Sequence, residues 1–195
     1  MPIIGVELVS DRLRLRPPGA ADAEPIAAQV NDWDVVRYTT SIPFPYDRSM
    51  AEAFVASQAR RWAAWSPETA PKEELTFAIE RSADQRLIGC IGLQPAESGD
   101  GVEFGYWLGR AYWGLGYATE AVQRLTRFTF EELSVPEIWA AAVPINDASQ
   151  RVLEKCGFAI VTAGERESEV RGHALPVVVR RLSRAQWAGA AKASA

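Results

Sequence analysis

The stretch that decides the fold is LGRAYWGLGYATE, residues 108–120. Alternating apolar residues over 102–108 predict a strand before it, and apolar residues spaced three and four apart over 118–128 predict a helix after it. Gly114 and Gly116 allow the connecting backbone to approach a ligand closely. A glycine-rich turn at the start of a helix points backbone N–H groups and the positive helix end at one place. The segment therefore predicts a phosphate-binding loop between a strand and a helix.

Three known kinds of phosphate-binding loop can be compared with this segment. A P-loop needs Lys and then Ser or Thr after its second glycine, and Leu115 and Gly116 stand there instead. A dinucleotide-binding fingerprint needs a third glycine where Thr119 stands, and it normally follows the first strand of a domain. The pyrophosphate loop of acyl-coenzyme A transferases, Q/R-x-x-G-x-G/A, matches at Gly114 and Gly116, but Ala111 replaces its Gln or Arg. The third kind fits best, and a purely structural turn is the remaining alternative.

The rest of the chain predicts one α/β (α+β) domain around a mixed sheet. No linker divides the chain, so we expect a single domain over residues 1–187 and a flexible tail of small residues over 188–195. The segment 31–47 is expected to be irregular and rich in aromatic residues, Asn146 to cap the last predicted helix and Gly157 to end it. Strands are expected at 12–16, 75–80, 87–93, 102–108, 138–143, 158–162 and 175–182, and helices at 20–30, 48–65, 118–128 and 147–156.

The composition argues against several classes of function. The chain has 195 residues and a formal charge of −4, which disfavours a general nucleic-acid binder. No apolar run approaches the roughly 20 residues that cross a bilayer, and residues 1–12 do not resemble a signal peptide. Two cysteines and one histidine, His173, form neither a metal-ligand pattern nor a hydrolase triad. We therefore expect a cytoplasmic protein with no resident metal and with no nucleic-acid or membrane partner.

A second segment, NDASQRVLEKCGF at 146–158, resembles the N-x-x-S-x-R-[VL]-[LY]-E-K-x-G-F segment of the GNAT N-acetyltransferases. The resemblance is closest to their ribosomal-protein alanine acetyltransferase (Rim-type) branch. The run WGLGYATEA at 113–121 resembles that branch's W-G-x-G-Y-A-T-E-A, and 103–108 resembles its E-x-G-Y-x-L strand. Two further segments, 12–16 and 88–93, resemble its R-L-x-L-R opening and its I-G-x-I-G-L strand. Because the five matches occur in family order, the chain is identified as a member.

The resemblance implies a single GNAT-like domain. Its mixed, mostly antiparallel sheet would contain a splayed pair of parallel strands, here 102–108 and 138–143, and would be flanked by helices. Acetyl-coenzyme A (acetyl-CoA) would lie between these strands as co-substrate, with its pyrophosphate on the loop before the helix. The residues that the resemblance implies for binding it are Leu108, Arg110, Trp113, Gly114, Leu115, Gly116, Tyr117, Ala118, Asn146 and Lys155.

Two residues would supply the implied acid–base chemistry. The acceptor ammonium must lose a proton before it attacks, and Glu103 matches the strand glutamate that would accept this proton directly or through a water. The departing thiolate gains from a proton or a hydrogen bond, but Leu153 stands where many family members have a tyrosine. The Rim-type branch offers a serine instead, and Ser149 fits its position. The structural alternatives are a solvated strand residue for Glu103 and a helix-capping role for Ser149.

The acceptor is an amine whose identity the sequence leaves open. In this family the segments 33–46 and 165–174 usually shape the acceptor groove, and the aromatic residues expected to line it are Trp33, Tyr38, Phe44 and Tyr46. The Pro-Val-Val-Val run at 176–179 departs from the branch pattern, which puts a ribosomal-protein substrate in doubt. A protein or peptide N-terminus is favoured. A small-molecule amine, such as an antibiotic or polyamine, and a non-catalytic coenzyme A-binding module are the alternatives, and a homodimer is left open.

Overall fold

The computed structural model of the chain describes residues 6–66, 70–97, 101–133 and 135–193. Its strands are β1 (Leu8–Val9), β2 (Leu13–Arg16), β3 (Leu75–Arg81), β4 (Arg86–Pro95), β5 (Val102–Leu108), β6 (Glu137–Ala142), β7 (Ala159–Arg166) and β8 (Leu175–Ser183). Its helices are η1 (Ala20–Asp22), α1 (Ala23–Val30), α2 (Trp33–Val36), α3 (Arg48–Ala64), η2 (Arg110–Tyr112), α4 (Tyr117–Glu131), α5 (Asp147–Lys155) and α6 (Arg184–Ala193).

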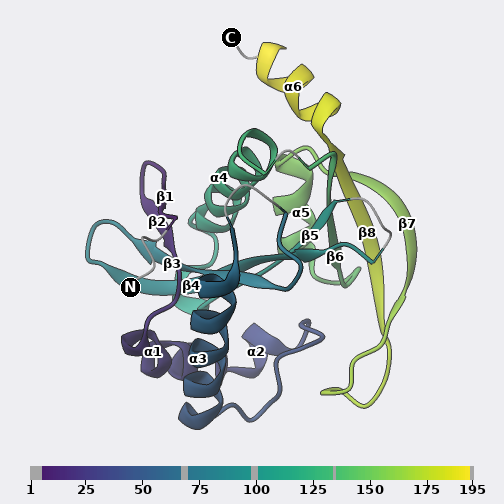
Figure 1. Ribbon diagram of the computed structural model, residues 1–195. Helices are drawn as coiled ribbons and strands as arrows, with labels where there is room; N and C mark the ends of the chain where they lie inside the picture. Colours follow the sequence, from purple (N-terminus) through teal and green to yellow (C-terminus); the bar gives the residue numbers. More distant parts are fainter. Residues whose placement is uncertain (1–5, 67–69, 98–100, 134, 194–195) are drawn as a thin grey trace.

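The strands form one mixed sheet in the order β1-β2-β3-β4-β5-β6-β8-β7. Neighbouring strands are antiparallel except β5 and β6, which are parallel. Helices α4 and α5 cover one face of the sheet, and α1, α2 and α3 cover the other (Figure 1). This arrangement confirms the expected α/β class and the mixed, mostly antiparallel sheet.

The parallel strands separate after a short paired segment. Their register joins Val102 to Ile138 and Phe104 to Ala140, and the pairing ends there. Beyond that point β5 continues to Leu108 along β4, while β6 continues along β8. The carboxyl ends of β5 and β6 therefore diverge, which confirms the expected splay.

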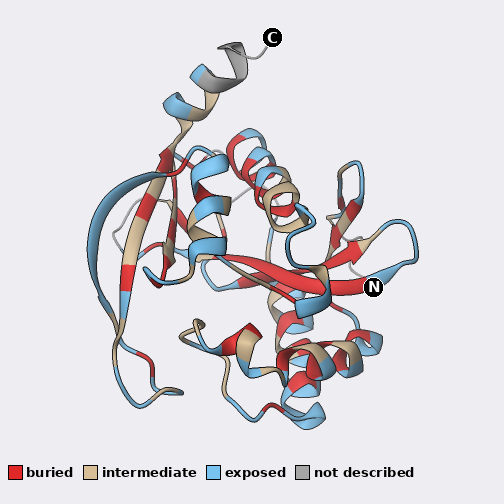
Figure 2. Cartoon of the chain, turned by 180° about the vertical axis from the view of Figure 1, so that it is seen from behind, coloured by how far each residue is buried: buried red, intermediate tan, exposed pale blue. Residues whose placement is uncertain are grey.

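Each face of the sheet has its own apolar cluster. One cluster packs α4 against the sheet, with Phe128 and Leu125 on Phe77. The second packs α1 and α3 against strand residues such as Cys90. Figure 2 shows that buried residues lie in the central strands, whereas β7 is exposed along most of its length. Helices therefore pack on both faces of the central strands, whereas the β7 edge is exposed.

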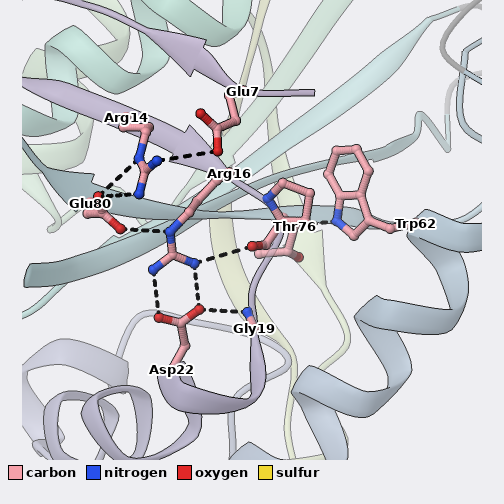
Figure 3. A network of polar contacts seen from close by, with 9 residues as sticks. Glu7, Arg14, Arg16, Gly19, Asp22, Trp62, Thr76 and Glu80 are labelled. Atoms are coloured by element: carbon pink, nitrogen blue, oxygen red, sulfur yellow. Dashed lines mark hydrogen bonds and ion pairs between the residues drawn. The ribbon is translucent and has the colours of Figure 1, made fainter. Parts of the chain in front are cut away.

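The alternating arginines of β2 form a buried ion-pair network (Figure 3). Leu13 and Leu15 enter the core, so the arginines between them point to the other face. Arg16 contacts Asp22 at 2.7 Å and Glu80 at 2.7 Å, and Arg14 contacts Glu80 at 2.8 Å. Both carboxylates are buried, and the hydrogen bond that Arg16 donates to Asp22 raises the pKa of Arg16. The network fastens β2 to β3 and to η1, which assigns these arginines a structural role.

The residues at the ends of α5 cap and terminate this helix as the sequence predicts. The Asn146 side chain accepts a hydrogen bond from the Ser149 N–H at 3.2 Å, which caps α5. Gly157 follows this helix with a φ of 85°, a left-handed conformation that suits glycine. Asp47 caps α3 in the same way, by accepting from the Met50 N–H at 2.9 Å. These caps set the direction in which α3 and α5 meet the sheet.

The structure differs from the sequence prediction in three segments. The segment 31–47 is not wholly irregular, because Asp32 caps the short helix α2. β7 runs four residues beyond the expected end at 162, because it pairs with β8 throughout. Helix α6 extends into the expected tail 188–195, of which residues 194–195 lie outside the described ranges. The flexibility of that tail stays a prediction.

Candidate active site

A cavity of about 1030 Å³ opens where β5 and β6 separate. From there it continues over the face of the sheet that α2 and α3 cover. Its lining comes from the loop before α4, from the start of α5, from the inner face of β3, β4 and β5, and from the segment 34–54. The cavity therefore joins the predicted phosphate loop to the predicted acceptor side.

The loop before α4 has the backbone geometry of an anion site. Gly114 and Gly116 have φ values of 74° and 83°, in the left-handed region that favours glycine. Gly116 is the N-cap of α4, and the Glu120 N–H donates to its carbonyl at 3.1 Å. The N–H groups of the first helical turn therefore have no acceptor within the helix. Because this turn lines the cavity, its N–H groups and the positive helix end can hold a phosphate there.

Arg12, the residue before β2, holds this loop by its side chain, a role that the sequence did not reveal. Its Nε donates to Glu120 at 2.7 Å, its Nη1 donates to the Leu115 carbonyl at 3.0 Å, and its guanidinium lies 4.7 Å from the Tyr117 ring centre. Burial would raise the pKa of Glu120, but hydrogen bonds from Arg12 and Ser10 outweigh it and lower that pKa. Arg12 and Glu120 lie 108 residues apart in the chain, so no local pattern could join them.

Two residues expected to bind coenzyme A have side chains that do not line the cavity. Arg110 donates to Asp34 of α2 at 2.6 Å, and Leu115 is exposed to solvent. The other expected residues, Leu108, Trp113, Gly114, Gly116, Tyr117, Ala118, Asn146 and Lys155, do line it. The Trp113 indole N–H donates to the Leu108 carbonyl at 2.8 Å, so that carbonyl already has a partner.

Two hydroxyl groups meet where the strands separate. The Tyr106 Oη and the Ser149 Oγ are 2.8 Å apart, and both residues line the cavity. Tyr106 was not a predicted site residue, although it is the tyrosine of the E-x-G-Y-x-L strand. Burial raises the pKa of Tyr106 above its ordinary value, so the phenol stays protonated near neutral pH. The pair can donate a hydrogen bond to an anionic sulfur.

Glu103 is buried at the edge of the cavity, so the alternative of a solvated strand residue is wrong. Both of its carboxylate oxygens accept hydrogen bonds from Arg166 at the end of β7, one of them at 3.0 Å. These bonds raise the pKa of Arg166. Arg166 was missed because it lies 63 residues further along the chain, although it falls in the segment expected to shape the acceptor groove. The ion pair fixes the carboxylate beside the cavity.

The four aromatic residues expected at the acceptor side divide into two groups. Tyr38 and Tyr46 line the cavity, whereas Trp33 and Phe44 do not. The latter two contact each other edge to face, with ring centres 5.4 Å apart, and both are exposed. Arg171 lies over the Trp33 ring at 5.2 Å. The structure therefore brings only the two tyrosines to the predicted groove.

The two segments expected to shape this groove are fastened to each other. The Ser168 hydroxyl, which is buried, donates to the Thr40 carbonyl at 2.8 Å. The Arg171 guanidinium donates to the Ile42 carbonyl at 2.9 Å, and burial lowers the pKa of this arginine. We call this pair of contacts the clasp. It holds the β7–β8 connection against the segment between α2 and α3.

The other titratable groups suggest no further chemistry. Within the described ranges, no three His, Cys, Asp or Glu residues are grouped so that they could hold a metal ion. His173 is an exposed turn residue, and burial raises the pKa of the Cys156 thiol to about 12. None of the described helices is long and apolar enough to cross a membrane.

Comparisons with known proteins agree with this geometry. A family model described as "Acetyltransferase (GNAT) domain" matches residues 12–159. The "Uncharacterized N-acetyltransferase p20" of Bacillus licheniformis is 28% identical over 184 residues, 93% of this chain and 98% of that protein. The "Uncharacterized N-acetyltransferase YoaA" of Bacillus subtilis is 31% identical over 152 residues, 77% of this chain and 81% of that protein.

A solved structure shares the fold. The crystal structure of a GNAT-family acetyltransferase from Bacillus anthracis superposes with a TM-score of 0.76 at 21% identity, over 92% of this chain and 99% of that one. Because the family model covers more than half of its length, the chain belongs to the GNAT family and is an acetyl-CoA-dependent N-acetyltransferase.

Proposed function

We propose that this enzyme acetylates the amino terminus of a protein or peptide. The single observation that supports this proposal most is the continuity of the cavity. One space of about 1030 Å³ joins the glycine turn, the splayed strands and the buried Glu103. An acyl donor and an amine could therefore meet in it beside a carboxylate. The Rim-type motifs at 113–121 and 146–158 favour a peptide N-terminus as the acceptor.

Acetyl-CoA supplies an acetyl group activated as a thioester. We assign its pyrophosphate to the backbone N–H groups of residues 113–118, because all of these residues except Leu115 line the cavity at the start of α4. Leu115 would contribute only its backbone, and Asn146 would orient the pantetheine arm while it caps α5. Lys155 lines the same cavity and can pair with the 3′-phosphate. We assign Arg110 no such role, because its guanidinium pairs with Asp34.

We assign Glu103 as the base that receives the proton of the acceptor ammonium. Because Arg166 occupies both carboxylate oxygens, we favour transfer through a bridging water over direct contact. The neutral amine then attacks the thioester carbonyl carbon, the carbon–sulfur bond breaks, and the second proton of the amine passes to the departing thiolate, which leaves as the free thiol of coenzyme A. Tyr106 and Ser149 donate the hydrogen bond that stabilises the departing thiolate.

Release of free coenzyme A, measured with a thiol reagent, tests this function. We would compare a peptide with a free amino terminus, the same peptide formylated at that terminus, a polyamine and an aminoglycoside. We expect release with the free peptide and none with the formylated one, because only the free amine can attack. Release with the polyamine or the aminoglycoside alone would contradict the peptide assignment.

A further inference from the structure

The floor of the cavity on β3, β4 and β5 contains a gap in the side chains. Residues paired across adjacent strands point to the same face of a sheet. The pairs that face the cavity are Gln94–Glu103, Gly92–Gly105 and Cys90–Trp107, and Thr76 of β3 continues the middle row. The middle row therefore has two adjacent glycines between larger residues. We call the resulting depression the glycine trench.

Neither backbone conformation nor packing requires glycine at position 105. The φ of Gly105 lies outside the left-handed region, and a Cβ placed on it would meet no atom within 4 Å. Gly105 is exposed although it lies within a strand of the sheet, because the cavity lies above it. Gly92 differs, since a Cβ there would come within 3.1 Å of the Thr76 Oγ1. Glycine at position 105 therefore leaves room in the cavity that a side chain would fill.

The polar row beside the trench contains a free amide. Glu74 is an ion-pair partner of Arg61 at 3.3 Å, and Glu103 is the partner of Arg166. Between them lies Gln94, which is half-buried and lines the cavity. In the part of the chain that the structure describes, its side-chain amide has no hydrogen-bond partner. A polycation would meet carboxylates that are already paired, whereas a peptide unit can both donate to and accept from this amide.

We propose that Gly105 and Gln94 determine which amines reach the acyl donor. The acceptor chain crosses β5 through the glycine trench, and Gln94 hydrogen-bonds its first peptide unit. The amine of a peptide N-terminus is attached to a carbon that carries both a side chain and a carbonyl, so it needs the clearance above Gly105. A linear amine does not need this clearance. The inference rests on the proposed acetylation of peptide N-termini.

The variant Gly105→Leu tests the clearance, with Gly164→Leu as its matched control. Gly164 lies on β7, outside the cavity lining, and its Cβ would also meet no atom within 4 Å. The two acceptors are a tetrapeptide with a free N-terminus and spermidine. In Gly105→Leu we expect kcat/KM for the tetrapeptide to fall about 10- to 100-fold, the scale of an overpacked site. For spermidine, we expect the same kcat/KM in Gly105→Leu as in Gly164→Leu. The affinity for acetyl-CoA, measured by tryptophan fluorescence, should also be the same in the two variants.

The variant Gln94→Leu tests the amide separately. We expect the KM for the tetrapeptide to rise about 3- to 10-fold, the scale of one lost hydrogen bond, with kcat unchanged. Gln94→Asn keeps the amide and should recover part of the loss. A purely structural role for Gln94 would instead affect both acceptors and would not be rescued.

Three outcomes overturn the inference. Equal losses with tetrapeptide and spermidine would show that Gly105 serves the reaction generally, and no loss with the tetrapeptide would show that the trench is not used. Wild-type turnover of spermidine but not of the tetrapeptide would overturn both the trench and the proposed N-terminal acceptor. That third outcome is recognised in the wild type alone, before any variant is made.

Discussion

Glu103 of β5 and Arg166 of β7 are bonded side chain to side chain, across the two strands that separate them in the sheet. The Glu103 side chain is 8% exposed, so the arginine is what compensates the burial of its charge. The ion pair thus links the proposed base to the segment that closes the acceptor side of the cavity.

Replacing Glu103 with Gln removes the proposed proton acceptor while keeping the size of the side chain. We expect kcat to fall about 100-fold or more, the scale of general base catalysis. The acetyl-CoA affinity should not change, because Glu103 is remote from the loop before α4. Glu97→Gln is the matched control, since Glu97 is an exposed carboxylate 3.8 Å from the same Arg166. A normal kcat in folded Glu103→Gln protein would exclude Glu103 as the base.

Removing either hydroxyl of the Tyr106–Ser149 pair should slow the departure of the thiolate. We expect Tyr106→Phe and Ser149→Ala each to lower kcat about 10-fold. The double variant should lose less than the product of the single effects, because the hydroxyls contact each other. Steady-state kinetics at saturating acetyl-CoA measures all three. A loss of kcat in the double variant equal to the product of the two single losses would argue against a joint action of the two hydroxyls.

The pH dependence of kcat gives a second test of Tyr106. Its pKa lies above the ordinary tyrosine value of about 10, since burial disfavours the phenolate. The proton that Tyr106 donates is therefore retained as pH rises, and we expect no loss of kcat from this group between pH 7 and about 10. A decline in that range that disappears in Tyr106→Phe would contradict the assignment.

A side chain at Gly116 should weaken the binding of acetyl-CoA. Gly116→Val forces a β-branched residue into a φ of 83°, which costs roughly 1–2 kcal/mol or displaces the N–H groups of the turn. We expect the Kd for acetyl-CoA to rise about 10-fold. Gly172→Val provides the control, because Gly172 has a φ of 72° and lies outside the cavity lining. Equal affinity in the two variants would remove the phosphate-loop assignment.

Arg12 should affect the same affinity without touching the ligand. Arg12→Met removes the guanidinium bonds to the Leu115 carbonyl and to Glu120, whereas the bond from the backbone N–H of residue 12 to Glu120 stays. We expect a higher Kd for acetyl-CoA and an unchanged kcat at saturation. Arg86→Met, at an exposed position of β4, serves as the control. If acetyl-CoA binds as tightly to Arg12→Met as to the wild type, the loop holds its shape without the Arg12 guanidinium.

The sequence predicted those features that depend on residues close together in the chain. The glycine turn and the cap at Asn146 follow from short motifs, the splayed strands were implied by the family resemblance, and the geometry of all three is as expected. The missed features join distant residues, as in Arg12–Glu120 and Glu103–Arg166. The hydrophobic periodicity of the sequence cannot predict such a contact, because the contact depends on the packing of the whole sheet.

The residues at the acceptor side of the cavity could also be predicted only in part from the sequence. Four aromatic residues in an irregular segment are equally suited to line a groove or to cover its rim. The structure places Tyr38 and Tyr46 on the cavity and turns Trp33 and Phe44 toward each other. The difference arises because α2, which is too short to give a periodic signal, reorients the chain at this point.

The clasp has a consequence for how this part of the protein opens. Ser168 and Arg171 donate to carbonyls of the segment between α2 and α3, which lies almost 130 residues earlier in the chain. Neither segment can detach without breaking bonds to the other. The two should therefore unfold locally as one cooperative unit, and their backbone amides should exchange hydrogen for deuterium at a common rate.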